Sequence, residues 1–183
     1  WCAEETFEVI PSYDTNRILK DEEVISLKSP TGEVSWKVHY TPGHCPGHIC
    51  LASDRYVISG DLAVMVGTIL IPSTDGNMDE YIESLRRIRS LEPSMLFPAH
   101  GPFTHHPSKL LDKYISHREG RHNRILEALE QGMSDIEKIA NHAYLDTPDA
   151  HPILKIDQTL SHLKSHERSG KVEKTPTGWK ILK

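Results

Sequence analysis

Three side chains able to bind a metal ion, those of His44, Asp61 and His100, each follow a short apolar stretch at a turn containing Gly or Pro. If these stretches are strands of one sheet, their ends bring the three side chains to loops at one edge. Imidazole and carboxylate groups together can hold a divalent cation, and such a cation activates water for hydrolysis. The pattern therefore predicts part of a metal-dependent hydrolytic site.

The elements that would position these residues alternate between strand and helix. Short β-prone runs at Phe7–Ile10, Glu23–Leu27 and Val34–Tyr40 are separated by turn residues. Apolar side chains at helical spacing predict a helix over Met78–Leu91, and Met95–Phe97 reads as the next strand. A strand, helix, strand succession is typical of helices packed on a sheet, so we expect an α/β layered fold.

The run from Val34 to Tyr40 alternates apolar and polar side chains. A period of two is expected when one face of a strand is buried. We therefore expect Trp36 and Val38 to face the core and His39 to face away from it.

The residues around the three ligands are Thr41–His48, Ser59–Asp61 and Pro98–Gly101. In order, spacing and flanking residues they resemble the later motifs of the metallo-β-lactamase superfamily. The resemblance implies an αβ/βα sandwich that binds a pair of zinc ions. It further implies that His44 and His100 each bind one metal ion, and that Asp61 is the catalytic residue that bridges both.

The same resemblance assigns His48 a supporting role beside the ligands rather than a place on the metal. His105 and His106 follow His100 closely, but adjacent loop residues diverge, and we expect both to be exposed.

Superfamily enzymes also carry an early His-x-His-x-Asp-His motif, which this chain lacks. We therefore expect the chain to be the C-terminal portion of a longer protein, with weak or absent zinc binding on its own. The missing N-terminal half, or a second copy of the chain, would be the partner that completes the site.

Helical patterns follow at Ser108–Glu130, Ile136–Ala140 and His151–Ser169, and a hairpin is predicted around Thr175–Gly178. Helices followed by a hairpin are the layout of a winged helix. We therefore predict three parts: residues 1–108 as the C-terminal portion of a metallo-β-lactamase domain, residues 109–122 as a connecting helix, and residues 123–183 as a winged-helix-like domain.

This tail resembles that of the lactamase-beta-like endoribonuclease branch, which implies hydrolysis of phosphodiester bonds in single-stranded RNA. Basic residues in the tail are candidates for phosphate contacts. They are Lys164, Arg168, Lys171 and Lys174. Solvated lysines of a small surface domain would give the same pattern.

Two other functions remain open on the sequence. A glyoxalase II-type thioester hydrolase shares the metal motifs, although that family typically ends in helices without a hairpin. A non-catalytic fragment that binds a partner fits the missing early motif.

The composition of the chain indicates which partners and which cellular compartment to expect. The net charge of −5 makes neither a nucleic-acid coat nor a membrane surface the default partner. Three cysteines are a sparse and odd set, and no apolar stretch reaches the roughly 18 residues of a membrane-spanning helix. We therefore expect a cytoplasmic protein without a membrane partner.

Overall fold

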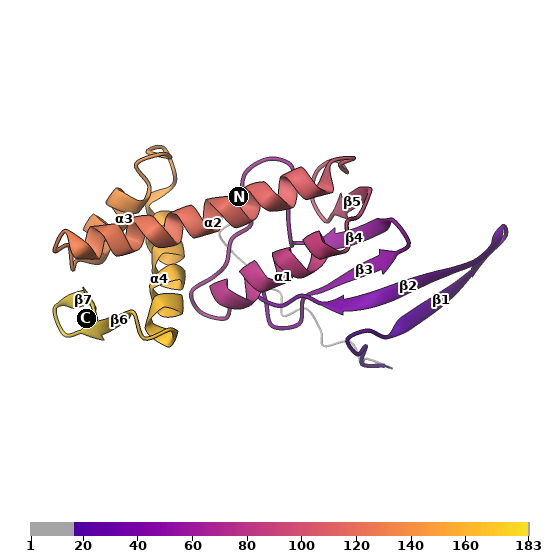
Figure 1. The fold of residues 1–183 in the computed structure, drawn as a ribbon, viewed down its shortest axis with the longest axis horizontal. Helices are drawn as coiled ribbons and strands as arrows, with labels where there is room; N and C mark the ends of the chain where they lie inside the picture. Colours follow the sequence, from indigo (N-terminus) through magenta and orange to yellow (C-terminus); the bar gives the residue numbers. More distant parts are fainter. Residues whose placement is uncertain (1–16, 183) are drawn as a thin grey trace, which may run out of the picture.

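The computed structural model describes residues 17–182 and shows a sheet covered by helices on one side, joined to a smaller helical unit (Figure 1). The predicted strand at Phe7–Ile10 lies outside the described residues. The sheet is five-stranded, in the order β1-β2-β3-β4-β5. Its strands are β1 (Val24–Ser29), β2 (Gly32–Tyr40), β3 (Ile49–Ser53), β4 (Tyr56–Gly60) and β5 (Met95–Pro98).

Helix α1 (Met78–Ser90) makes the crossover between β4 and β5, which pair in parallel, whereas the other neighbouring strands are antiparallel. The Asn77 side chain caps the helix by accepting from the backbone N–H groups of Asp79 and Glu80. Its apolar face, including Tyr81 and Leu85, is buried against the sheet. The predicted helix is thus confirmed, and so is the α/β layering.

Val38 in β2 is buried as predicted, with 1% of its surface exposed, but the prediction that His39 faces away from the core is wrong. His39 pairs directly with Cys50, which is fully buried in the core under α1, so His39 lies on the helix-covered face and is only 4% exposed. The opposite face carries the apolar series that includes Trp36, and it continues through Ile58 and Phe97. Within the described part of the chain no helix covers that face, which explains why Ile58 remains 41% exposed.

The rest of the chain forms a second unit. It consists of α2 (Pro107–Glu130), α3 (Ile136–Ala143), α4 (Pro152–Arg168) and the hairpin of β6 (Val172–Thr175) and β7 (Gly178–Ile181). These elements agree with the helices and hairpin that the sequence predicts.

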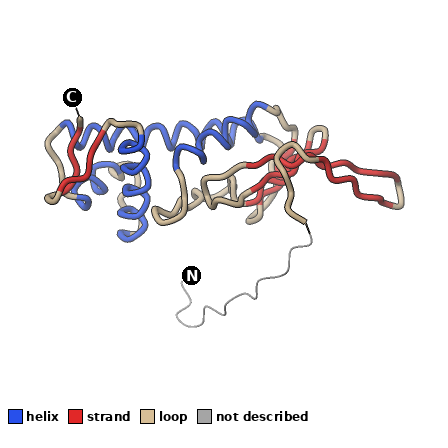
Figure 2. The backbone as a smooth tube through the Cα atoms, turned by 90° about the horizontal axis from the view of Figure 1, so that it is seen from below, coloured by secondary structure: helices blue, strands red, loops and turns tan. Residues whose placement is uncertain are grey.

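Helix α2 runs without interruption along both units, as Figure 2 shows. Its first half, with Leu111 and Tyr114, packs into the core of the sheet unit. Its second half, with Ile125 and Leu129, packs with residues such as Trp179 of the hairpin into a separate core. Residues 109–122, predicted as a connecting helix, are therefore the larger N-terminal part of one long helix that both cores share.

Within residues 17–182, no helix combines the length and the apolar character needed to cross a lipid bilayer.

Candidate metal centre

The turn that carries His44 is fixed against the start of α1. Gly43 has a φ of +128°, and a Cβ atom there would lie 2.4 Å from the backbone of Tyr81. The Gly43 carbonyl accepts a hydrogen bond of 2.8 Å from the Asn77 N–H. A residue with a side chain could not occupy this position without moving the helix, so the Pro-Gly before His44 sets how closely strand β2 and helix α1 approach.

The His44 ring is oriented by a backbone carbonyl. Its Nδ1 lies 2.8 Å from the Leu70 carbonyl oxygen. Because a carbonyl can only accept, Nδ1 carries the proton and Nε2 keeps its lone pair. Nε2 faces Asp61, 3.9 Å from Oδ2. This is the geometry in which an imidazole is ready to bind a metal ion.

Asp61 follows strand β4 after an irregularity in the strand register at Gly60, which has a φ of +52°. A Cβ atom at Gly60 would lie 2.8 Å from His48 Nε2. That same nitrogen accepts a hydrogen bond of 3.0 Å from the Asp61 N–H. The closeness of His48 therefore requires glycine at position 60 and fixes the backbone that presents the carboxylate.

His48 is held from its other side by Thr41, whose carbonyl and hydroxyl oxygens both lie 2.9 Å from Nδ1. Nδ1 thus donates to the Thr41 carbonyl while Nε2 accepts from Asp61. Burial lowers the pKa of His48 below its ordinary value, which keeps the ring neutral and able to accept. His48 touches the backbone of Asp61 rather than facing its carboxylate, in line with the supporting role expected of it.

His100 completes the group from the end of β5. The Ala99 N–H donates to the Gly60 carbonyl at 3.0 Å and holds the two strand ends together. His100 Nε2 lies 3.5 Å from Asp61 Oδ1, and the His100 side chain is 76% exposed. The structure therefore brings together all three residues predicted as ligands.

The Asp61 carboxylate fits a bridging ligand. One oxygen faces each imidazole, at distances too long for hydrogen bonds. Oδ1 is buried and has no hydrogen-bond partner among residues 17–182. A buried carboxylate oxygen without a donor is costly unless a cation binds it. The donor set suits zinc and also iron.

These residues nevertheless make half of a centre. Each metal ion would receive one imidazole and one carboxylate oxygen, whereas zinc usually takes about three or four protein ligands. Over the part of the chain that the structure describes, no group of three His, Cys, Asp or Glu side chains could hold a single metal ion. His105 and His106 are exposed, as expected, and add no ligand.

The basic residues predicted to contact RNA divide into two pairs. Lys164 donates to the Ser73 carbonyl at 2.6 Å, and Arg168 binds Asp79 at 2.7 Å. Both side chains therefore hold α4 against the sheet unit. Lys171 and Lys174 are exposed.

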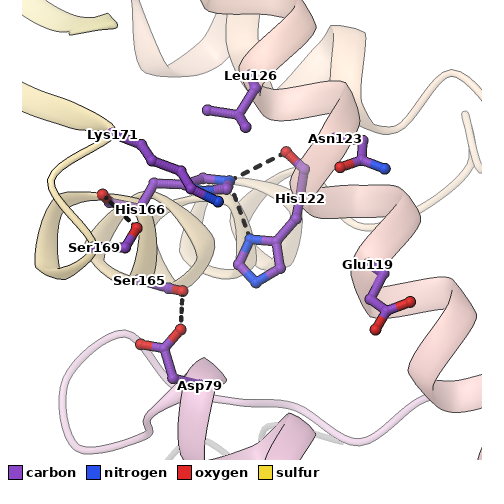
Figure 3. A pocket seen from close by; sticks show the side chains of 9 residues that line it. All are labelled: Asp79, Glu119, His122, Asn123, Leu126, Ser165, His166, Ser169 and Lys171. Atoms are coloured by element: carbon purple, nitrogen blue, oxygen red, sulfur yellow. Dashed lines mark hydrogen bonds between the residues drawn. The ribbon is translucent and has the colours of Figure 1, made fainter. Parts of the chain in front are cut away.

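Sequence reasoning missed a histidine cluster between α2 and α4 (Figure 3). His122 Nδ1 lies 3.1 Å from His166 Nε2 and 3.2 Å from His162 Nδ1. Beside these rings is a cavity of about 250 Å³ that Asp79 and Lys171 also line. The spacing of His162 and His166, four residues apart on one helix, could have indicated that they share a face.

Histidines on either side of a half-buried carboxylate, at the edge of a sheet covered by helices, are typical of part of a metallohydrolase centre. The family model for the metallo-beta-lactamase superfamily matches residues 5–100, more than half of the chain. The chain belongs to this superfamily.

Two curated relatives illustrate its range. The beta-lactamase-like protein 2 homolog of Caenorhabditis elegans is 29% identical over 75% of this chain and 46% of its own length. The atrochrysone carboxyl ACP thioesterase of Aspergillus fumigatus is 26% identical over 63% of this chain and 35% of its own length. The chain thus spans less than half the length of either protein.

Solved structures agree on the fold. A beta-lactamase domain protein from Burkholderia ambifaria matches 93% of this chain and 53% of its own, with a TM-score of 0.78 and 21% identity. A metallo-beta-lactamase family protein from Thermus thermophilus matches 90% of this chain and 54% of its own, with a TM-score of 0.72 and 16% identity. The likeness therefore extends into the C-terminal helices.

Proposed function

We propose that this chain supplies one half of a two-metal centre that hydrolyses its substrate. The observation that carries the proposal is the Asp61 carboxylate, which presents one oxygen to His44 and the other to His100. In this role His44 and His100 would each hold one metal ion, and Asp61 would contribute a carboxylate oxygen to both. Metal ions held there supply an activated water and a Lewis acid.

The residues of the chain provide the positioning. Leu70 fixes the protonation of His44 through Nδ1, and His48 holds the Asp61 backbone through its neutral Nε2. Both contacts orient the side chains that would hold the metal ions.

The uncovered face of the sheet is where we place the other half of the centre. Trp36, Ile58 and Phe97 line a hollow of about 450 Å³ there. Apolar strands buried on both faces are typical of a sandwich. We propose that the N-terminal half of the same fold packs on this face and brings the remaining ligands, and that the chain alone binds metal weakly and is inactive. A second copy of the chain is the alternative occupant.

For the substrate we propose the phosphodiester backbone of single-stranded RNA. Support comes from the unit formed by α3, α4 and the β6–β7 hairpin, whose helices followed by a hairpin we interpret as a winged-helix-like domain. Lys171 and Lys174 are exposed at its β6 edge. Cationic side chains on such an edge can contact phosphates.

A thioester is the second candidate, because one relative is named as an acyl-carrier-protein thioesterase. Water activated by a metal ion could also attack a thioester carbonyl, so the proposed ligands fit both reactions. One fold supports many substrates, and the ligands do not distinguish between them.

The test begins with the metal content of the purified chain, by plasma mass spectrometry. We expect well below one zinc ion per chain. The full-length protein that contains this chain then receives zinc and, in parallel, a labelled single-stranded RNA and an acyl thioester, each with and without a chelator.

Chelator-sensitive cleavage of RNA alone is the expected result. Thioester hydrolysis without RNA cleavage would replace the substrate assignment. A full-length protein that binds no metal would overturn the proposed function.

A further inference from the structure

The segment between Asp61 and α1 contains no helix or strand, yet it orients a metal ligand. The Leu70 carbonyl in this segment accepts from His44 Nδ1 at 2.8 Å. The position of that carbonyl therefore determines which nitrogen of His44 is free for a metal ion. What holds Leu70 in place thus matters for the centre.

The residues on both sides of Leu70 are bound by buried side chains of the second unit. Gln158 on α4 donates from Nε2 to the Ile71 carbonyl at 2.7 Å, and its Oε1 accepts from the Ile71 N–H at 3.3 Å. Arg118 on α2 donates to the Ile69 carbonyl and, at 3.1 Å, to Gln158 Oε1. Arg118 is 2% exposed and Gln158 is 6% exposed. Hydrogen bonds shielded from water in this way are stronger than exposed ones.

A second set of contacts holds the segment a few residues later. Asp157 on α4 accepts from the Ser73 hydroxyl at 2.6 Å and from the Ser73 N–H at 3.2 Å. Lys164, further along the same helix, donates to the Ser73 carbonyl at 2.6 Å. Side chains from one helix thus bind the backbone on both sides of Pro72.

We propose that Gln158, together with Arg118, is a positioning residue for the metal centre. Gln158 holds the Ile71 N–H, which belongs to the same peptide group as the Leu70 carbonyl, and so fixes that carbonyl in place. The Leu70 carbonyl in turn keeps the proton of His44 on Nδ1 and its lone pair on Nε2. The C-terminal unit then serves the chemistry of the sheet unit, whatever substrate it also contacts. The inference rests on the proposed function only in taking His44 as a ligand.

The test uses the variant Gln158→Glu. This change keeps the shape of the side chain and an oxygen that accepts from Arg118 and Ile71. It replaces the donor to the Ile71 carbonyl with a carboxylate oxygen, which repels that carbonyl and places a negative charge beside Arg118. We expect a measurable share of His44 to move to the Nε2–H tautomer, detected in long-range proton–nitrogen NMR spectra of the metal-free chain. We also expect zinc affinity to fall about 10-fold, as is typical when a partner of a ligand is lost.

The matched control is Ile139→Ala, which opens a cavity in the core of the second unit without touching the segment. It should lower stability while leaving the His44 tautomer unchanged. An unchanged tautomer in folded Gln158→Glu, or an equal change in the control, would overturn the inference.

Hydrogen exchange of the unmodified chain gives a measurement that does not depend on any variant. The Ile71 and Ser73 N–H groups should exchange as slowly as those of α4, because α4 holds them. Exchange at the rate of an exposed loop would overturn the inference. The NMR readout needs no metal, so a full-length protein that bound no zinc would count against the proposed function and leave this inference to be decided by the tautomer.

Discussion

Two groups of histidines in this molecule have opposite properties. His44 and His100 lie at the sheet edge, partly exposed, on either side of a buried carboxylate oxygen that has no hydrogen-bond partner within residues 17–182. His122, His162 and His166 lie between α2 and α4, where they contact one another. Burial lowers the pKa of each ring in the second group.

The difference shows what marks a metal site in a chain with twelve histidines. At the sheet edge, each imidazole has a nitrogen available and an anionic oxygen nearby. A cation bound between them would stabilise this arrangement. In the helical cluster, His166 Nε2 donates to the His122 carbonyl, so His122 and His166 already use each other and the backbone as partners. The buried Nε2 of His162 has no partner among residues 17–182, but no carboxylate faces it at hydrogen-bond distance. Neutral, mutually bonded histidines are typical of a packed core rather than of a ligand set.

The largest effect should come from Asp61→Asn. The variant keeps the shape of the side chain but removes the charge that both metal ions would share, so we expect the zinc affinity of the full-length protein to fall by about 100-fold or more. Since Oδ1 has no hydrogen bond to lose among the described residues, the free energy of unfolding should change by less than about 0.5 kcal/mol. Zinc titration against a competing chelator and chemical unfolding provide the two measurements.

His162→Leu is the companion variant from the other group. It replaces a fully buried ring and should leave zinc affinity unchanged. If this variant weakened zinc binding as much as Asp61→Asn, the helical cluster would be the metal site and the comparison would fail.

The next effect is on stability against pH. Burial lowers the pKa of His122 from its ordinary value of 6.5 to about 4 and lowers that of His162 further. Between pH 4 and pH 6.5 the unfolded chain binds more protons than the folded chain. The free energy of unfolding is therefore highest above pH 6.5 and decreases as the pH falls towards 4. His122 alone would account for about 3 kcal/mol of that loss at pH 4.

The charges around the cluster act in both directions. The positive charge of Lys171 lowers the pKa of His122 and His166, and the negative charge of Asp79 raises both. Urea unfolding at a series of pH values should show a smaller slope in His162→Leu and an unchanged slope in His105→Gln, which alters an exposed loop. An equal slope in all proteins would mean that the cluster does not titrate on unfolding.

Much of the fold could be predicted from local patterns. The helix at Met78 begins at a capping Asn and has apolar residues at helical spacing, and these signals depend only on neighbours in the sequence. The burial of His39 on the helix-covered face of β2 could not be predicted in the same way. The alternation of Trp36 and Val38 with polar residues correctly indicates a strand, but which face the helix covers depends on pairing with β3.

In the candidate site, too, only the roles that depend on neighbouring residues could be predicted. The turn chemistry around His44 and Asp61 is local, so the ligands could be predicted from residues beside them. The roles of Gln158 and Arg118 depend on contacts with a segment more than forty residues away in the chain. Nothing near Gln158 in the sequence indicates its partner. Lys164 and Arg168 were predicted from charge alone, and charge does not show that a side chain is already engaged.

The smallest expected effect distinguishes the exposed Lys174 from Lys164, which is bound to the backbone of the sheet unit. If Lys174 contacts a phosphate, Lys174→Ala should reduce the salt dependence of RNA binding by about one counterion and leave stability within about 0.5 kcal/mol. Lys164→Ala should do the reverse, because its ammonium group holds the Ser73 carbonyl: stability should fall by about 1 kcal/mol and the salt dependence should not change. Fluorescence anisotropy over a salt series and urea unfolding measure the two quantities. Equal changes in salt dependence would place Lys164 on the RNA as well, and no change in either variant would remove the β6 edge as an RNA contact.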